Sequence, residues 1–152
     1  MRQTLALMLL LIAAPTFAAS IKDTIYGQAT VSEVTSIYDA DTFRVNIADW
    51  PEVVGYRIPI RVVGVDAPEI RGKCEQEKVR ARAAKQFTVA ALRGARSIEL
   101  RNIKRGKYFR LLAEVWVDGR NLSDELIRAG HARPYDGGTR AGWCETDPEG
   151  GR

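Results

Sequence analysis

The chain has 152 residues, of which 45% are hydrophobic and 28% are charged, and its formal net charge is +4. This length fits one domain, and the composition excludes a disordered tail, a collagen-like rod and a polytopic membrane protein. A single histidine and two cysteines exclude most zinc sites and any mechanism that needs two histidines. The basic excess suits a polyanionic partner without proving one.

The first 18 residues predict a secretory signal peptide. A basic residue precedes an apolar run of ten residues from Leu5 to Ala14, and Thr16 and Ala18 are the small residues that a cleavage site after Ala18 needs. The run is too short for a membrane anchor, which needs about 20 residues. Residues 19–152 then form one exported domain, periplasmic or secreted, without stable membrane association, and we expect it to be a monomer.

Three strands are predicted in the first half of this domain. Residues 28–37 and 42–47 alternate apolar and polar positions and are rich in β-branched side chains. Residues 56–65 form the third strand, which Pro59 marks as an edge or a bend. Residues 48–55 predict a loop.

A long helix is predicted over residues 75–92, with Gly94 as its end. Apolar residues recur there at three- and four-residue steps and predict the buried face, made of Val79, Ala83, Phe87 and Ala90 or Ala91. We interpret the basic residues of this helix as a solvated face rather than a track for nucleic acid: Lys78, Arg80, Arg82 and Lys85.

The rest of the chain predicts two more strands and a short helix. The strands cover residues 97–103 and 109–117, and Ser123 caps a helix that ends near Gly130. The tail from about residue 134 is rich in Gly, Asp and Thr and predicts irregular structure. Five strands with one long and one short helix predict an α+β domain, a small barrel with attached helices.

Three isolated residues have a structural and a functional interpretation. Trp116 alternates with apolar strand neighbours, which predicts a core position, whereas Trp50 lies in a loop and is the better candidate for stacking on a base. His131 follows the short helix and predicts a surface position rather than a catalytic role.

The predicted export of the domain indicates the state of its two cysteines. In an oxidising environment Cys74 and Cys144 are expected to pair, closing a loop of about 70 residues. The loop-entropy model assigns such a bond roughly 4 kcal/mol of stability. The alternative is two free thiols, because the sequence alone does not bring their Cα atoms together.

Three short stretches carry candidate chemistry. Residues 39–42 place two carboxylates at a tight turn between strands, residues 61–69 run from an arginine through a strand to two acidic residues, and residues 107–113 place Arg110 at the start of a strand. Taken singly, each has an ordinary interpretation: a β-turn, solvated loop charges and an edge arginine that covers apolar surface.

Together these residues form a set for phosphodiester hydrolysis without histidine. Asp41 and Asp66 offer the hard oxygen ligands that one Ca²⁺ ion prefers. Glu69 can take a proton from water as general base. Arg61 and Arg110 can hold a phosphate as bidentate forks and stabilise the charge that grows on it.

The ordered set of motifs resembles the staphylococcal (micrococcal) nuclease family, or thermonucleases. The motifs read DADT (39–42), RVVGVDAPE (61–69), KYFRLLA (107–113) and GRNLSDELIRAGHA (119–132). The resemblance implies a five-stranded OB-fold barrel with attached helices. It also implies Ca²⁺-dependent cleavage of DNA and RNA at the 5′ P–O bond, which leaves 3′-phosphate ends.

Position by position, the resemblance implies the roles just given and adds others. The two aspartates match metal carboxylates, and Ala67 would add its backbone carbonyl where the family often has Thr. Glu69 matches the proposed base, and both arginines match phosphate arginines. Lys107 and Tyr108 match residues beside a substrate phosphate, and Tyr135 lies near a tyrosine that contacts the nucleotide.

The sequence departs from the family pattern at two turns. Ala40 replaces the usual Gly, which would strain the metal loop by roughly 1 kcal/mol if the position needs a positive φ. Gly106 and Phe109 stand where Asp and Gly commonly flank the Lys-Tyr pair. We expect a bulky Phe109 beside Arg110 to alter the position of the bound substrate.

Two other function classes remain open. A non-catalytic OB-fold module could hold nucleic acid or a protein ligand, and its mark would be loss of the arginines or Glu69, none of which is lost. A secreted structural or adhesin domain would not require two arginines and three carboxylates at these spacings.

Overall fold

The computed structural model describes residues 24–144. The predicted signal peptide and the end of the tail therefore lie outside the described residues. Between residues 24 and 144, no helix combines the length and the hydropathy that a bilayer crossing requires.

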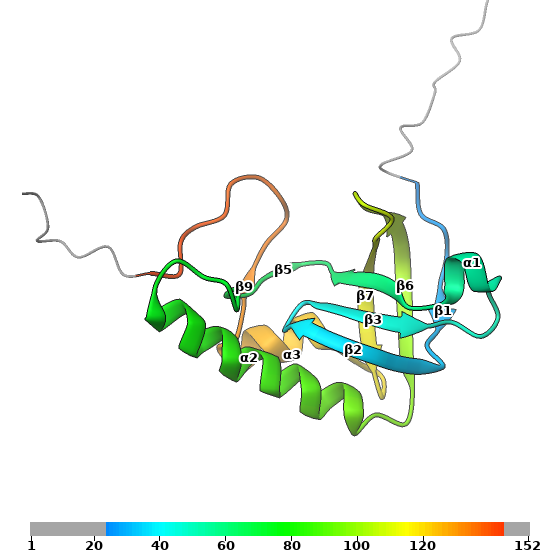
Figure 1. Ribbon diagram of the computed structural model, residues 1–152, viewed down its shortest axis with the longest axis horizontal. Helices are drawn as coiled ribbons and strands as arrows, with labels where there is room; N and C mark the ends of the chain where they lie inside the picture. The colour runs from blue at the N-terminus through cyan, green and yellow to red at the C-terminus, as the bar shows by residue number, and fades with distance from the viewer. Residues whose placement is uncertain (1–23, 145–152) are drawn as a thin grey trace, which may run out of the picture.

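Seven strands form one curled, mixed sheet in the spatial order β1-β6-β7-β4-β3-β2, with β8 beside β7 (Figure 1). Their bounds are Ala29–Thr30 (β1), Glu33–Asp39 (β2), Thr42–Asn46 (β3), Ile58–Val62 (β4), Ile98–Arg105 (β6), Leu111–Val117 (β7) and Arg120–Asn121 (β8). β4 and β7 are parallel, and the other pairs are antiparallel. Since β1 and β2 are the two ends of this order, the sheet is a half-barrel.

A second, two-stranded sheet joins the middle of the chain to its C-terminal part. β5 (Val65–Asp66) pairs antiparallel with β9 (Arg133–Pro134). The predicted strand over residues 56–65 is therefore interrupted, and Gly64, at a φ of +83°, provides the break. The predicted 28–37 strand is likewise divided between β1 and β2.

Three helices accompany the sheet. They are α1 (Glu52–Gly55), inside the segment predicted as a loop, α2 (Glu75–Arg93) and α3 (Leu122–Arg128). Gly94 is the C-cap of α2, as predicted. The cap of α3 is Asn121 rather than Ser123, because the Asn121 side chain accepts the Ser123 N–H at 2.8 Å. The Ser123 hydroxyl instead donates to the Val63 carbonyl at 2.7 Å.

The buried face of α2 agrees only in part with the predicted one, since Phe87 and Ala91 pack against the core but Ala83 and Ala90 are exposed. Val79 is 53% exposed, and the buried residues are Glu77, Ala81, Ala84, Thr88 and Leu92. Alanines on several sides of the helix made its apolar stripe ambiguous in the sequence. The face is selected by contacts with β2 and with the turn after it, where the Thr88 hydroxyl donates to the Ala40 carbonyl at 2.8 Å.

The core lies between the curved sheet, α3 and the buried side of α2, which contributes Ala84 and Leu92. Its largest fully buried side chains come from β3, β4, β6, β7 and α3: Phe43, Val45, Ile60, Val62, Leu100, Ile103, Val115, Leu122 and Leu126, with Val65 of β5. Trp116 does not belong to it, contrary to prediction. Ala113, Val115 and Val117 point inward, so Trp116 points outward and packs under Arg101, whose Cζ lies 4.2 Å from the ring centroid.

Candidate active site

Asp41 and Arg61 form a buried ion pair on neighbouring strands. The register of β3 and β4 places Thr42 opposite Arg61. Arg61 Nη1 donates to Asp41 Oδ1 at 2.6 Å, and the Thr42 hydroxyl donates to the same oxygen at 2.9 Å. Asp41 is 1% exposed, and burial raises the pKa of its carboxyl although Arg61 opposes this. Burial likewise lowers the pKa of the Arg61 guanidinium.

The turn before Asp41 carries no backbone strain. Ala40 does not adopt a positive φ, so the strain expected from the missing glycine does not arise. Its side chain is buried and its carbonyl accepts from Thr88 of α2. Asp39 accepts the Ile70 N–H at 3.4 Å, and burial raises the pKa of Asp39.

The segment after β5 carries Asp66, Ala67 and Glu69. Asp66 is 4% exposed and Ala67 is 2% exposed, whereas the Glu69 side chain is 55% exposed. Asp66 Oδ2 accepts from Arg133 Nη2 at 3.0 Å and from Trp143 Nε1 at 3.1 Å. The carboxylates of Asp66 and Glu69 thus differ in access to solvent, which suits a fixed ligand and a proton acceptor respectively.

Glu77 fixes the loop between Glu69 and α2. Its carboxylate accepts the N–H of Glu69 at 3.3 Å and that of Lys73 at 2.9 Å. A Cβ at Gly72 would lie 2.4 Å from this side chain, so a larger residue there would displace the Glu77 carboxylate from its position. Our sequence analysis missed Glu77, although an acidic residue three positions after the helix cap, here Cys74, is a recognisable capping pattern.

Arg110 directly precedes β7 and ends a tight turn over residues 107–110. The Arg110 N–H donates to the Lys107 carbonyl at 3.2 Å, and Tyr108 and Phe109 both have positive φ, at 56° and 57°. The Tyr108 side chain is exposed. Among the described residues, Arg110 Nε is buried without a hydrogen-bond partner. Such an atom is rare in native proteins and suggests a missing ligand.

An apolar cavity of about 340 Å³ adjoins Arg110. Its walls include the aromatic side chains of Tyr26, Trp50 and Phe109. Trp50 is half-buried against the core rather than freely exposed in its loop.

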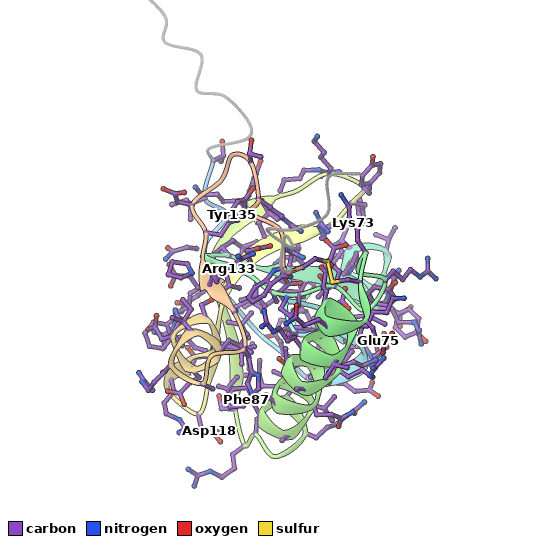
Figure 2. All side chains as sticks on the ribbon, turned by 90° about the vertical axis from the view of Figure 1, so that its left-hand side faces the viewer. Lys73, Glu75, Phe87, Asp118, Arg133 and Tyr135 are labelled. Carbon is purple, nitrogen blue, oxygen red and sulfur yellow. A yellow bond between two sulfur atoms is a disulfide. The ribbon has the colours of Figure 1, made fainter. Side chains whose placement is uncertain are left out.

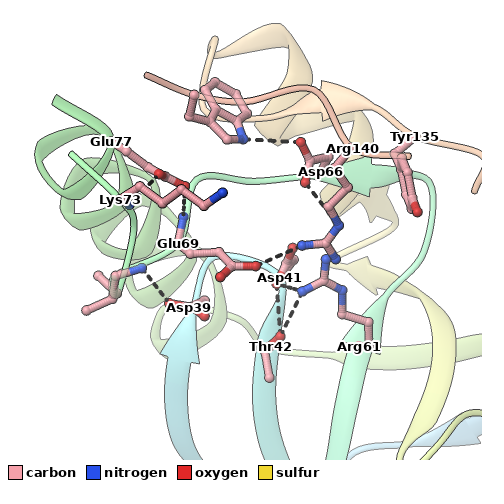
Figure 3. A network of polar contacts seen from close by, with 12 residues as sticks. Asp39, Asp41, Thr42, Arg61, Asp66, Glu69, Lys73, Glu77, Tyr135 and Arg140 are labelled. Carbon is pink, nitrogen blue, oxygen red and sulfur yellow. Dashed lines mark hydrogen bonds and ion pairs between the residues drawn. The ribbon is translucent and has the colours of Figure 1, made fainter. Parts of the chain in front are cut away.

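Arg140, from the C-terminal tail, lies among the carboxylates of Asp41, Asp66 and Glu69, which we call the acidic cluster. Its Nη1 lies 2.8 Å from Glu69 Oε1, and its Nε lies 3.4 Å from Asp66 Oδ1 (Figure 3). Burial lowers the pKa of Arg140, but the charges of Asp66, Asp41 and Glu69 outweigh this effect. The pKa of Arg140 is therefore raised above its ordinary value. Sequence reasoning missed this residue because a lone arginine in a glycine-rich tail has no periodicity or partner to identify it.

Tyr135 lies at the same rim. Its N–H donates to the Gly64 carbonyl at 3.0 Å, and its hydroxyl donates to the Gly138 carbonyl at 2.8 Å. The Arg140 Cζ is 5.6 Å from its ring centroid. The predicted nucleotide-contacting tyrosine therefore lies beside the acidic cluster.

A disulfide joins Cys74 and Cys144, whose Cα atoms are 6.0 Å apart, as predicted (Figure 2). It connects the end of the described tail to the start of α2. Glu77 lies within 4.8 Å of both sulfurs. Because the two sulfurs are bonded to each other, this group offers no thiolate pair for a metal.

The structure brings together part of the predicted set: Asp41 is paired with Arg61, and Asp66 and Glu69 are paired with Arg140. Lys107 and Tyr108 lie in the turn before β7, and no hydrogen bond or ion pair between the described residues joins them to these carboxylates. Arg140 interacts with all three carboxylates, Arg61 is bonded to Asp41, and the charges of both Arg140 and Arg110 act on Arg61. Carboxylate oxygens are the donors that a hard divalent cation prefers, so the chemistry of this set fits Ca²⁺. In the described residues, however, the three carboxylates do not bring their oxygens within 4.8 Å of one another, and Arg140 is paired with two of them.

The family model described as staphylococcal nuclease homologue matches residues 59–144, more than half of the chain. The chain belongs to this family. No curated protein matches it in sequence. The half-barrel with three helices is accordingly the predicted OB-fold of α+β class. Membership of the staphylococcal nuclease homologues supports a nuclease-like or nucleic-acid-binding function.

Proposed function

We propose that this protein is an exported, Ca²⁺-dependent nuclease that hydrolyses phosphodiester bonds of DNA and RNA. By resemblance to its family, it would cleave the 5′ P–O bond and leave 3′-phosphate ends. The observation that supports this best is the meeting of Asp41, Asp66 and Glu69 with Arg61 and Arg110 at one rim of the half-barrel.

One Ca²⁺ ion would be held by the carboxylates of Asp41 and Asp66 and by the backbone carbonyl of Ala67. When bound, it would polarise a phosphoryl oxygen as a Lewis acid. Asp41 suits this role because its burial disfavours the free charged carboxylate, so a nearby cation stabilises it.

The side chains around the metal ligands would have separate roles in the reaction. Glu69, with its exposed carboxylate, would take a proton from the attacking water. Arg61 and Arg110 would hold the phosphate and stabilise its growing negative charge, and the unpartnered Nε of Arg110 is available for this. Lys107 and Tyr108, in the turn before Arg110, would flank a neighbouring phosphate.

The alternative is a non-catalytic nucleic-acid-binding module. One observation favours it: Arg140 is paired with both Asp66 and Glu69, which would neutralise the acidic cluster. The exposed Tyr108 and Phe109 would then serve as stacking surfaces for bases.

Plasmid nicking separates the two functions. We expect nicking by the purified protein in Ca²⁺, none in EDTA, and loss of nicking in Glu69→Gln. The matched control is Glu52→Gln, at an exposed position in α1, which should nick like the wild type. Intact plasmid together with a retained gel shift in Ca²⁺ would instead establish the binding module.

Export is tested independently. Expression of the full chain in a bacterium with two membranes should yield protein that begins at Ala19 in the periplasm or the medium. Protein that keeps Met1 and stays in the cytoplasm would contradict this part of the proposal without affecting the nuclease assignment.

A further inference from the structure

The tethered segment, residues 136–144, brings into the acidic cluster an arginine that no motif predicts. We propose that Arg140 binds a phosphate of the nucleic-acid substrate, as a third arginine beside Arg61 and Arg110, and that the disulfide holds it in place. This inference rests on the proposed function, because it names a further substrate contact of the same site.

Both ends of the tethered segment are fixed. Before it, β9 pairs with β5, so that Arg133 lies opposite Asp66. The Arg133 guanidinium then folds over the segment and donates to the carbonyls of Ala141 at 2.8 Å and Gly142 at 3.1 Å. At the far end, Cys144 is bonded to Cys74. A loop closed on both sides keeps Arg140 at the rim.

Arg140 remains accessible to a ligand. Its ion pairs with Glu69 and Asp66 use Nη1 and Nε, and 37% of its side chain is exposed. A buried structural ion pair would be closed to solvent, as Asp41 and Arg61 largely are. The exposed side of this planar guanidinium can therefore meet a phosphate as a fork while its carboxylate contacts orient it.

Positive charge is concentrated where Arg140 lies. After burial and the opposing effect of Asp41, the charges of Arg140 and Arg110 lower the pKa of Arg61. Carboxylates already compensate Arg61 and Arg140 in part, through Asp41 and through Asp66 and Glu69. Arg110 Nε is buried and makes no hydrogen bond to the described residues, so it is available to a phosphate that the other two arginines also contact.

Calorimetric titration tests the proposal. The probe is a deoxynucleoside 3′,5′-bisphosphate, added to the mature, disulfide-bonded protein in saturating Ca²⁺. We expect Arg140→Gln to weaken binding about tenfold and Arg140→Lys to weaken it less, because lysine keeps the charge but not the fork. The control Arg96→Gln removes an equal charge from an exposed position beyond the opposite end of α2 and should change binding less than twofold.

Removal of the disulfide provides a second test in the same binding experiment. We expect Cys74→Ser/Cys144→Ser to weaken bisphosphate binding by a factor of about three to ten, because the segment is no longer held. If the bond acts through Arg140, adding Arg140→Gln to this double variant should bring the total loss only to the level of Arg140→Gln alone, about tenfold, and not to the product of the two separate losses. Full additivity of the two effects would refute the tether.

The outcomes are distinguishable. Wild-type protein that binds neither Ca²⁺ nor the bisphosphate would overturn the proposed function and this inference with it. If the wild type binds both and Arg140→Gln binds the bisphosphate equally well, only the inference fails. An Arg140→Gln variant that binds Ca²⁺ more tightly and the bisphosphate unchanged would show that Arg140 is a counter-ion competing with the metal, which also overturns it.

Discussion

The two halves of the candidate site are held by different means. Asp41 and Arg61 lie on paired strands, buried and bonded to each other at 2.6 Å. Arg140 is 37% exposed and belongs to a loop that a two-residue strand pair and a disulfide restrain. The strand half is therefore positioned by the fold itself, whereas the tethered half depends on one covalent bond that the environment can break.

The largest expected effect comes from breaking that bond. Cys74→Ser/Cys144→Ser should lower the free energy of unfolding by about 4 kcal/mol, because the bond closes a separation of 70 residues in the unfolded chain. Urea denaturation measures this change. A loss below about 1 kcal/mol would contradict the expectation.

Hydrogen exchange in the same double variant sharpens the comparison. Amides of the tethered segment should exchange faster, whereas those of β3 and β4 should keep their relative protection, since the strand ladder does not involve the bond. Equal acceleration in both regions would show that the two halves are one cooperative unit.

Arg61→Ala is expected to break the strand half. It removes the partner of the buried Asp41, and an uncompensated buried carboxylate costs about 3 kcal/mol or more. Thermal unfolding measures the loss, and turnover should fall as well because a phosphate contact disappears. Unchanged stability would mean that water enters and solvates Asp41 in the variant.

Arg110→Ala is expected to lower turnover without lowering the stability of the fold. We expect turnover in Ca²⁺ to fall by about 100-fold while the protein stays folded, because Arg110 Nε makes no hydrogen bond to the described residues. The control is Arg105→Ala, whose guanidinium lies over the Phe109 ring at 5.1 Å in the same turn region. Near-normal rates in Arg110→Ala would refute its assigned role.

Phe109→Gly addresses the turn that precedes Arg110. Phe109 has a φ of 57°, a region that costs a bulky residue about 1 kcal/mol, and the family commonly has glycine there. We expect the variant to be more stable by up to about 1 kcal/mol in urea denaturation. A clear loss of stability would mean that packing against Arg105 and the adjoining cavity outweighs the backbone strain.

The strand half and the disulfide could be predicted from the sequence, whereas the presence of Arg140 in the site could not. Asp41, Asp66, Glu69, Arg61 and Arg110 stand in motifs whose order and spacing are informative. Arg140 makes contacts across 71 positions to Glu69, which no local pattern encodes. The buried face of α2 was predicted only in part, for a related reason. Alanines on several sides of the helix give a weak hydrophobic contrast, and the orientation of the helix depends on the contact of Thr88 with the distant Ala40 carbonyl.

The smallest effect concerns Asp39 and pH. Burial raises the pKa of Asp39 above its ordinary value of 3.8, so the folded protein binds this proton more tightly than the unfolded chain does. Stability from this group is therefore lost as pH rises through the folded-state pKa. In EDTA, Asp39→Asn should be more stable than the wild type at pH 7, with the difference shrinking as the pH approaches 4. The exposed control Asp49→Asn should show no such trend in denaturation measured across this range, and an equal trend in both would trace it to net charge instead.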